Sequence, residues 1–392
     1  MVPMTSVPFL PGLRLPGPWR ARMVTAAREA EAEAGERDAD GQFPAASFRA
    51  LRLQGLLSAP LPPSLGGGGL GGLELLTVLR LLGRASLPVG RLYEGHVNAL
   101  DLVARYGTLE QAVRAAQDAS EGHLFGVWNT EEPPGLRLHA EGEALTLSGG
   151  KTFASGAGWV TRPLLPAEGA QGRQLLLLPS ERVPGQIDGA FWRPLGMRAT
   201  VSARVDYSGT QPEPRDLIGG PGDYYRQPVF SSGALRFLAV QLGGADRLMG
   251  EARGYLSALG RAGDEVQRLR FATLAARLEG AALSVRRGCA LQGALGDRPS
   301  DKTHEEGFLA YVALARTLTE DACMEVLDGV ERAVGARGLI APLPFERLIR
   351  DLRTYLRQPA PDAARLTLGR HRLEGEPGSP EAWDEWEWEG KE

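Results

Sequence analysis

The sequence predicts an α+β protein that is mainly helical, with an N-terminal helical domain, a central antiparallel β domain and a C-terminal four-helix bundle. Residues 20 to 120 carry apolar side chains at helical spacings of three and four. From residue 123 to 215 the pattern changes to short runs that suit strands, and long helical segments return after residue 216. With 392 residues, 43% of them hydrophobic, the chain is long enough to bury the cores of two or three domains.

The first predicted domain, residues 1–121, contains four segments with helical spacing. They read ARMVTAAREAEAEAGER, FPAASFRALRLQGLL, LELLTVLRLLGRA and VGRLYEGHVNALDLVARYG. The loop PSLGGGGLGG lies between the second and third segments, and Gly67, Gly69 and Gly72 match the pattern G-x-G-x-x-G. A dinucleotide site needs a strand before these glycines, whereas SAPLPPSL precedes them, so we expect a flexible connection between helices.

The second and third predicted domains differ in the period of their apolar residues. Residues 122–215 hold the short runs HLFGVWNT, LRLHAEG, ALTLSGG, WVTRPLL, RQLLLLP and ARVDYSG, which suit an antiparallel sheet of half-buried strands. In the third domain, residues 216–372, apolar residues spaced by threes and fours continue over more than twenty residues, from Val312 to Val334. Helices of this length predict a bundle.

The C-terminal residues 373–392 form a separate acidic tail in the sequence. This tail carries eight acids and one lysine, so the net charge of −4 leaves the rest of the chain at about +3 by subtraction. Glycine, proline and repulsion between like charges predict a disordered tail. The alternative is that Trp383, Trp386 and Trp388 dock on a partner or a neighbouring subunit.

Composition also bears on the compartment and on several classes of partner. The sequence has no dense Lys/Arg stripe of the kind that binds nucleic acid, so nucleic acid is not an expected partner. No apolar run approaches the ~20 residues of a membrane span. Cys289 and Cys323 are too few for a disulfide framework, and the proline-containing start does not resemble a signal peptide, so we expect a cytoplasmic protein. The five histidines show no metal-ligand spacing, so we expect no metal site. They are His96, His123, His139, His304 and His371.

Six strings in order resemble segments of the acyl-CoA dehydrogenase superfamily of FAD-dependent flavoenzymes, over about residues 20 to 371. They are FPAASFRALRLQGLLSAPLPPSLGGGGLGG, RYGTLEQAVRAAQDASEG, GVWNTEEP, LSGGKTFASGA, LGMRATVSARVDYSGT and VGARGLIAPLPFERLIRDLRT. The resemblance implies an FAD cofactor and an oxidoreductase acting on an acyl-CoA or acyl-like substrate. Either an electron-transfer flavoprotein or a flavin reductase would be its redox partner.

The resemblance implies flavin contacts on two strands. Trp128, Asn129 and Thr130 lie on the matching flavin-contact strand, while Phe153 matches an aromatic wall over the ring and Ser155 a hydroxyl near N5. Hydrogen bonds near N5 stabilise the charge that develops there when hydride arrives. Without the resemblance, Phe153 would be a core residue, Ser155 a turn residue and Trp128 a buried strand residue beside a surface turn.

Further residues match a second flavin contact. Gly335 and Gly338 match a glycine turn that touches the FAD of a neighbouring subunit in family members, which implies a homodimer or homotetramer. Arg332 stands where the family usually has glutamine, and its guanidinium would either pair with a pyrophosphate or face solvent. The usual Arg-x-x-Phe-Gly segment is replaced, with Arg268 and Arg270 as substitutes, in a helix connection shortened as in the flavin monooxygenase branch.

The family's catalytic glutamate is missing at both of its usual positions. One falls at Pro359 and the other near Ala234 to Arg236, where there is no acid, so Asp362 is the local candidate base for α-proton removal. The segment RTYLRQPAPDAARL also resembles the dibenzothiophene monooxygenase-like branch of the family, although it lacks the histidine which that branch has near the position of Arg357. There Arg357 and Gln358 would orient an acidic substrate or a flavin hydroperoxide; otherwise they form a solvated helix end before a Pro-x-Pro turn.

Three functions are therefore open at this point. The first is an FAD-dependent dehydrogenase of acyl-CoA-like substrates, and the second is a monooxygenase that uses reduced flavin, FMN included, on a hydrophobic substrate. The third is a family member that binds a ligand or a protein and catalyses nothing. Near the C-terminus, Glu346 with Arg350 and Arg347 with Asp351 have helical spacing, which predicts a salt-bridge lattice rather than catalysis.

Overall fold

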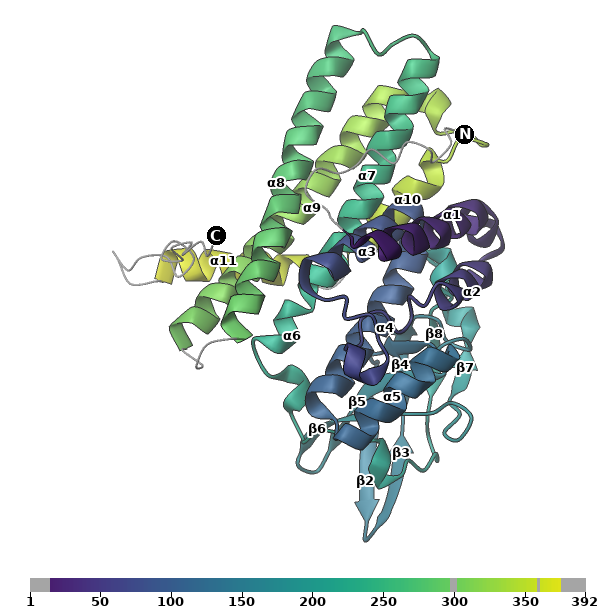
Figure 1. The fold of residues 1–392 in the computed structure, drawn as a ribbon, viewed down its shortest axis with the longest axis vertical. Helices are drawn as coiled ribbons and strands as arrows, with labels where there is room; N and C mark the ends of the chain where they lie inside the picture. Colours follow the sequence, from purple (N-terminus) through teal and green to yellow (C-terminus); the bar gives the residue numbers. More distant parts are fainter. Residues whose placement is uncertain (1–14, 297–301, 358–359, 375–392) are drawn as a thin grey trace.

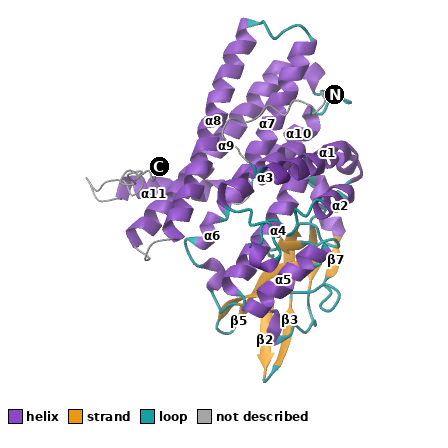
Figure 2. Cartoon of the chain, viewed as in Figure 1, coloured by secondary structure: helices purple, strands orange, loops and turns teal. Residues whose placement is uncertain are grey.

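The computed structural model describes residues 15–296, 302–357 and 360–374, and it confirms the predicted fold class. In Figure 1 the long helices α7, α8 and α9 lie at one end of the molecule, the strands lie at the other end, and α1, α2 and α3 lie between them. Figure 2 shows the strands gathered beneath α4 and α5. The acidic tail lies outside the described residues from position 375 onward, and residues 373 and 374 continue the last helix.

The N-terminal part is helical, as predicted. Its helices are α1 (Gly17–Asp40), α2 (Ala45–Leu53), α3 (Gly72–Ala85), α4 (Leu87–Tyr106) and α5 (Leu109–Glu121). Helix α5 begins at a capping box, in which Thr108 Oγ1 accepts the Gln111 N–H and Gln111 Oε1 accepts the Thr108 N–H. It ends at Gly122, whose left-handed conformation turns the chain into the first strand.

The β part consists of two sheets. Their strands are β1 (Phe125–Val127), β2 (Arg137–Glu141), β3 (Ala144–Ser148), β4 (Gly150–Ala154), β5 (Arg162–Gly169), β6 (Gly172–Leu177), β7 (Gln186–Asp188), β8 (Ala203–Asp206) and β9 (Leu217–Ile218). One sheet has the order β3-β2-β5-β6-β9 with β1 beside β5, and the other has the order β4-β8-β7. The larger sheet is mixed rather than wholly antiparallel, because β1 runs parallel to β5 and β2 meets β5 in parallel at one position.

Helices α4 and α5 cover one face of the larger sheet. Apolar residues of both helices form a compact cluster with Phe125 of β1, Leu164 of β5 and Leu175 of β6. Helix α4 also contributes to the larger core that runs through the bundle, because Leu92, Tyr93 and Val97 pack there. One helix thus belongs to both cores and fixes the sheet relative to the bundle.

The C-terminal part is built around α7. Its helices are α6 (Val229–Ser232), α7 (Ala234–Ala258), α8 (Glu265–Gly296), α9 (Lys302–Gly338), α10 (Phe345–Tyr355) and α11 (Pro361–Glu374). Helix α7 packs on α8, α9 and α10 and also crosses α3. At that crossing a Cβ on Gly83 would lie 2.2 Å from the Val240 carbonyl oxygen, and one on Gly243 would lie 2.1 Å from the Arg80 carbonyl oxygen. Glycine at both positions therefore lets the two backbones meet.

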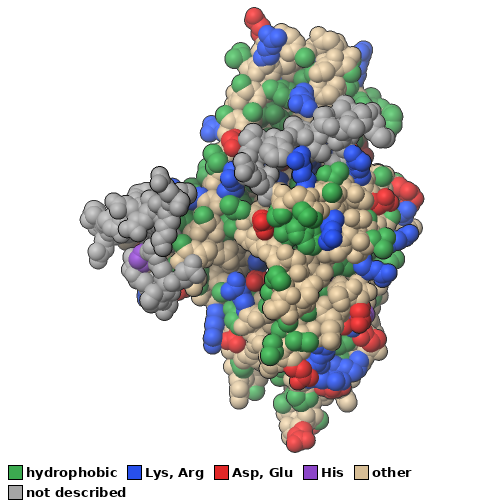
Figure 3. Space-filling model, in the orientation of Figure 1, with side chains coloured by type: hydrophobic (Ala, Val, Ile, Leu, Met, Phe, Trp, Pro, Cys, Tyr) green, Lys and Arg blue, Asp and Glu red, His purple; other side chains and the backbone are tan. Residues whose placement is uncertain are grey.

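The surface carries charges of both signs. On the face shown in Figure 3, acidic and basic side chains are interspersed rather than gathered by sign. Within the described residues, no helix combines the length and the apolar character needed to cross a membrane.

Candidate functional site

Two cavities meet where the sheets face the helices, and they share Thr130 and Phe153. The large cavity has a volume of about 860 Å³ and the small cavity one of about 280 Å³. The large cavity is lined by Thr130, Phe153, Phe191, Trp192, Arg193, Pro194, Leu195, Met324, Arg353, Thr354 and Arg357. Cavities that bind small molecules commonly have such volumes, with a mostly apolar wall and a few polar groups.

Phe153 stands in the wall between the cavities because of an irregularity in the smaller sheet. The pairing of β4 with β8 shifts register between Lys151 and Ala154, and Phe153 there adopts a φ of 52°. This left-handed conformation is uncommon for a bulky residue and is found most often at functional sites. The Phe153 ring is 42% exposed, and it makes edge contacts with Phe191 and Trp192 at centroid distances of 5.3 and 5.9 Å.

An ion pair with a buried lysine holds β4 against the segment that follows β1. The fully buried Lys151 Nζ lies 2.5 Å from Glu131 Oε2, and Arg173 donates to Glu131 Oε1 at 3.1 Å. Burial lowers the pKa of Lys151 while Glu131 opposes that change. Because Glu131 follows Thr130 and Lys151 precedes Phe153 by two residues, the pair fixes Thr130 and Phe153 relative to each other.

The opposite wall of the large cavity comes from α9 and α10. Thr354 Oγ1 accepts the Gly196 N–H at 3.0 Å, and Asp351 Oδ1 accepts the Met197 N–H at 2.6 Å. A Cβ on Gly196 would lie 2.2 Å from the backbone of Arg350, so the glycine allows this close approach. These bonds join the loop that contains Leu195 to α10.

Two guanidinium groups lie on this wall. Arg353 donates to Glu331 at 2.6 Å, and Arg357 donates to Glu320 at 2.8 Å. Arg357 is more than half exposed and also contacts Met324 Sδ at 3.8 Å, and each guanidinium keeps further N–H groups beyond these contacts. The pair could therefore bind an anionic group of a ligand in the large cavity.

The small cavity is more polar than the large one. Glu94 accepts from Arg91 at 2.6 Å and also from the Asn98 amide. Three polar atoms of the lining residues are buried without a hydrogen-bond partner: Asn98 Oδ1, Arg236 Nε and the Tyr355 hydroxyl. Tyr355 is 3% exposed, and burial raises the pKa of its hydroxyl well above the usual range, so it stays protonated as a donor.

Four of the residues predicted from sequence lie at these cavities. Thr130, Phe153 and Arg357 line the large cavity together, and Asn129 lines the small cavity beside Thr130. The Asn129 side-chain oxygen accepts a hydrogen bond from the Tyr225 hydroxyl at 2.8 Å. Their roles toward a flavin remain predictions.

Two other predicted residues lie behind the cavity wall. Trp128 is buried and donates its indole N–H to the Ser155 carbonyl oxygen at 3.0 Å. The Ser155 hydroxyl accepts from the Ser202 hydroxyl at 3.2 Å, and neither Trp128 nor Ser155 belongs to the lining of the two cavities. Both residues support the strand that carries Phe153.

The remaining predicted residues lie farther from the cavities. Arg332 pairs with Asp328 at 3.0 Å on the surface of α9, and Gly335 and Gly338 lie at the end of that helix. Gly335 has a φ of 62° and interrupts the helix, as a glycine turn requires. Their expected contact is with a neighbouring subunit and stays a prediction. Asp362 is exposed in the first turn of α11 and lines neither cavity, and Gln358 lies outside the described residues.

Sequence reasoning missed most of the small cavity. Arg91, Glu94 and Asn98 come from α4, Arg236 from the first turn of α7 and Tyr355 from the end of α10. In the sequence Tyr355 continues a stripe of core residues along its helix, so it looks like one more core aromatic. The available signal was Arg236 itself, a guanidinium at one of the two positions where the family resemblance predicts a catalytic acid.

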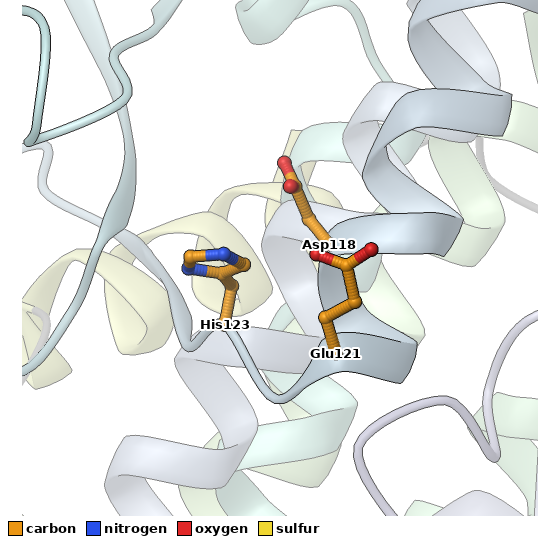
Figure 4. A group of neighbouring side chains, drawn as sticks. All are labelled: Asp118, Glu121 and His123. Carbon is orange, nitrogen blue, oxygen red and sulfur yellow. The ribbon is translucent and has the colours of Figure 1, made fainter.

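A cluster of possible metal ligands lies at the end of α5, apart from the cavities. Figure 4 shows Asp118, Glu121 and His123, whose ligand atoms all lie within 4.8 Å of one another. Both Asp118 oxygens accept from Arg162, at 2.6 and 3.0 Å, and His123 Nδ1 bonds the Thr161 hydroxyl at 2.9 Å. The bonds of Asp118 to Arg162 tie α5 to the start of β5.

The order of helices, middle sheet and helical bundle, with a cavity between sheet and bundle, defines an acyl-CoA dehydrogenase-like fold. The chain belongs to the acyl-CoA dehydrogenase family. Its residues 21–122 match the acyl-CoA dehydrogenase N-terminal domain, and residues 222–356 match the C-terminal domain, together more than half of the chain. The resemblance in the sequence is thereby confirmed.

Known relatives include two kinds of enzyme. Dibenzothiophene monooxygenase of Rhodococcus erythropolis is 25% identical, over 88% of this chain and 90% of the relative. Mitochondrial short-chain specific acyl-CoA dehydrogenase of Bos taurus is 24% identical, over 87% and 85%. Among solved structures, FMN-bound TdsC from Paenibacillus sp. A11-2 has a TM-score of 0.83 at 23% identity, covering 90% of this chain and 97% of that one. At that identity the likeness establishes the fold.

Proposed function

We propose that this protein is a monooxygenase that takes up reduced FMN in the large cavity and a small substrate in the small cavity. The observation that carries the proposal is the distribution of acids. Among the described residues, no carboxylate lines the large cavity, and Glu94 is the one acid that lines the small cavity. Since both Glu94 oxygens accept hydrogen bonds, a free base for α-proton removal is lacking.

The residues of the large cavity fit a flavin mononucleotide. Phe153, Phe191 and Trp192 offer an aromatic wall for a planar ring, and Arg353 and Arg357 offer donors for a phosphate. The volume of about 860 Å³ lies within the usual range for ligands of this size. When bound, a reduced flavin supplies two electrons to O₂, so that one oxygen atom enters the substrate and the other leaves as water.

The chain's own residues have separate roles in this proposal. Phe153 and Thr130 form the boundary at which a flavin ring and a substrate would meet. The Tyr355 hydroxyl would donate a hydrogen bond to the substrate, because the raised pKa keeps its proton in place. The loop held by Asp351 and Thr354 forms one wall of the large cavity. A partner flavin reductase would deliver the reduced cofactor.

The comparisons support this proposal, because monooxygenases are found among both the sequence relatives and the structural neighbours. Acyl-CoA dehydrogenation is a second candidate, favoured by the short-chain dehydrogenase relative and by Glu94 inside the small cavity. In that reading either Glu94 or the exposed Asp362 would be the base.

The test compares flavin binding with flavin reduction. We expect the purified protein to bind chemically reduced FMN under anaerobic conditions at least about tenfold more tightly than oxidised FMN. We also expect that a panel of acyl-CoAs will not bleach the bound oxidised flavin. Bleaching by an acyl-CoA that is lost in Glu94→Gln or Asp362→Asn would establish the dehydrogenase instead. Absence of flavin uptake in either redox state would favour a family member that only binds a ligand or protein.

A further inference from the structure

We propose that the small cavity selects a small organic anion, an oxyacid such as a carboxylate, through the Arg236 guanidinium and the Tyr355 hydroxyl. This inference rests on the proposed function, in which the small cavity is the substrate chamber beside the flavin. It departs from the acyl-CoA or hydrophobic substrate that the sequence alone predicts.

The charge of the lining favours an anion. Among the described residues, the guanidinium groups of Arg91, Arg236 and Arg316 line the small cavity against the single carboxylate of Glu94. Arg91 and Glu94 neutralise each other at 2.6 Å. The counterion of Arg236 is Asp101, which lies outside the lining, so within the described part of the chain the guanidinium has no acid beside it on the cavity side other than Glu94.

Arg236 is held in place from outside the cavity. Its two terminal nitrogens both lie 3.3 Å from Asp101 Oδ2, and Asp101 also pairs with Arg105 at 3.0 Å. Asp101 and Arg105 do not line the small cavity. The Arg236 Nε, by contrast, is buried and makes no hydrogen bond within the described part of the protein, and Arg236 is one of the residues that line the cavity.

The Tyr355 hydroxyl supplies a second independent observation. Tyr355 is 3% exposed and lines the cavity, yet its hydroxyl has no hydrogen-bond partner in the protein. Buried polar groups without partners are rare in folded proteins and call for an explanation such as a ligand. Both unpartnered donors match the acceptor oxygens of an oxyacid, and bonds to a charged acceptor are the stronger kind.

The size of the cavity limits the anion to a small molecule. The volume of about 280 Å³ is about a third of the volume of the large cavity. A coenzyme A thioester would have to leave most of its length outside, whereas a compound of benzoate size would fit. Asn98 Oδ1, the unpartnered acceptor in the lining, additionally suits a substrate that carries an O–H or N–H group.

Calorimetric titration with benzoate and with benzamide tests the inference, because the two probes have the same shape and differ in charge. For the wild-type protein we expect benzoate to bind about tenfold more tightly than benzamide. Arg236→Gln should abolish that preference, and Tyr355→Phe should reduce it. Arg105→Gln is the matched control, since it removes the other guanidinium bound to Asp101 and should keep the preference.

Several outcomes would overturn the inference. Equal affinity for the two probes, no binding of either, or equal losses in Arg236→Gln and Arg105→Gln would each contradict an anion site at Arg236. An unchanged preference in Tyr355→Phe would remove the hydroxyl from the site.

FMN fluorescence quenching, measured separately, distinguishes failure of the anion-site inference from failure of the proposed function. If the wild-type protein prefers benzoate but binds no flavin, the proposed anion site stands and the proposed monooxygenase function is contradicted. One that binds FMN without the benzoate preference keeps the flavin site and refutes the anion proposal.

Discussion

Phe153 combines backbone strain with an exposed aromatic side chain. A φ of 52° in a bulky residue costs on the order of 1–3 kcal/mol, so the surrounding structure must impose it. The backbone on both sides is fixed, because the Thr152 N–H donates to the Thr130 carbonyl at 2.8 Å and Ala154 pairs with Ala203. The strain places the ring at the boundary between the two cavities, and the proposed flavin contact would explain why it is kept.

If Phe153 contacts the flavin, replacing it should weaken FMN binding and leave the stability of the fold nearly unchanged. In Phe153→Gly we expect the Kd for FMN to rise about fivefold to tenfold, since an aromatic contact contributes about 0.5–1.5 kcal/mol. The free energy of unfolding should stay within about 1 kcal/mol of wild type, because glycine adopts a positive φ without strain. Fluorescence titration and urea unfolding measure the two effects.

Trp159→Ala is the matched control for Phe153→Gly, because Trp159 is 50% exposed, stacks on Phe43 and lines neither cavity. Its FMN affinity should equal that of the wild type. A loss of FMN affinity as large in Trp159→Ala as in Phe153→Gly would contradict the assignment of Phe153.

For Tyr355 we predict that a substitution in the buried core does not lower the free energy of unfolding. Removing a buried hydroxyl that lacks a partner removes a desolvation cost, so Tyr355→Phe should leave the free energy of unfolding unchanged or raise it by up to about 1 kcal/mol. Urea unfolding of the protein without ligand measures this difference. A loss of more than about 1 kcal/mol would mean that the hydroxyl has a structural partner.

Individual residues were predictable where a motif or a local spacing marks them. The lattice expected on α10 is confirmed, with Arg350 paired to Glu346 at 2.6 Å and Arg347 to Asp351 at 3.8 Å. Thr130 and Phe153 were located through two short strings, one that runs on from β1 and one that includes β4. Tyr355 carries no such mark, because the helices that line the small cavity are distant in sequence and meet only in the fold; they are α4, α6, α7, α9 and α10.

At the scale of elements, the Lys151–Glu131 pair determines how β4 stands against the segment after β1. Removing one partner of a buried ion pair leaves an uncompensated charge, which costs about 3–5 kcal/mol. We therefore expect Glu131→Gln to lower the free energy of unfolding by about that amount, and the double variant Glu131→Gln with Lys151→Met to recover much of it. Urea unfolding of the two variants measures the recovery.

An exposed pair on the same sheet provides the control. Arg204 and Glu132 pair at 2.8 Å with both side chains about half exposed, so Glu132→Gln should cost less than about 1 kcal/mol. Equal losses in Glu131→Gln and Glu132→Gln would show that the burial of Lys151 is not what makes its pair important.

The elements themselves were largely predictable, because their apolar periods are local properties of the sequence. The capping box of α5 and the return of helices after the sheets are examples. The parallel contact of β1 with β5 was not predictable, since Phe125 and Arg162 pair across intervening hairpins and nothing local encodes that choice.

At the scale of the whole molecule, charged side chains join parts that are distant in sequence. Arg80 on α3 binds Asp246 on α7 at 2.7 and 2.9 Å, and Arg350 on α10 binds Asp38 on α1 at 2.7 Å. Asp351 joins α10 to the loop beside the large cavity through the Met197 N–H. The sequence could not reveal these pairs, because each partner looks like an ordinary helical charge until the fold brings the two together.

Asp351 gives the molecule a dependence of stability on pH that can be isolated by substitution. Burial raises the pKa of its carboxyl from 3.8 to about 6. A raised pKa means that the folded protein holds the proton more tightly than the unfolded chain, so the stabilisation is present below pH 4 and is lost as the pH rises through about 6. Relative to Asp351→Asn, wild type should therefore lose about 3 kcal/mol of unfolding free energy between pH 4 and pH 7.

Urea unfolding of both proteins across that range measures the difference, and Glu346→Gln provides a control of opposite sign. The hydrogen bond from Arg350 lowers the pKa of Glu346, so its stabilising contribution is present above about pH 4.5 and is lost as the pH falls. The difference between wild type and Glu346→Gln should therefore grow with rising pH, whereas the difference involving Asp351→Asn falls. If both differences change in the same direction, then the proton on Asp351 is not held by burial, and the contact between α10 and the cavity loop does not depend on its protonation.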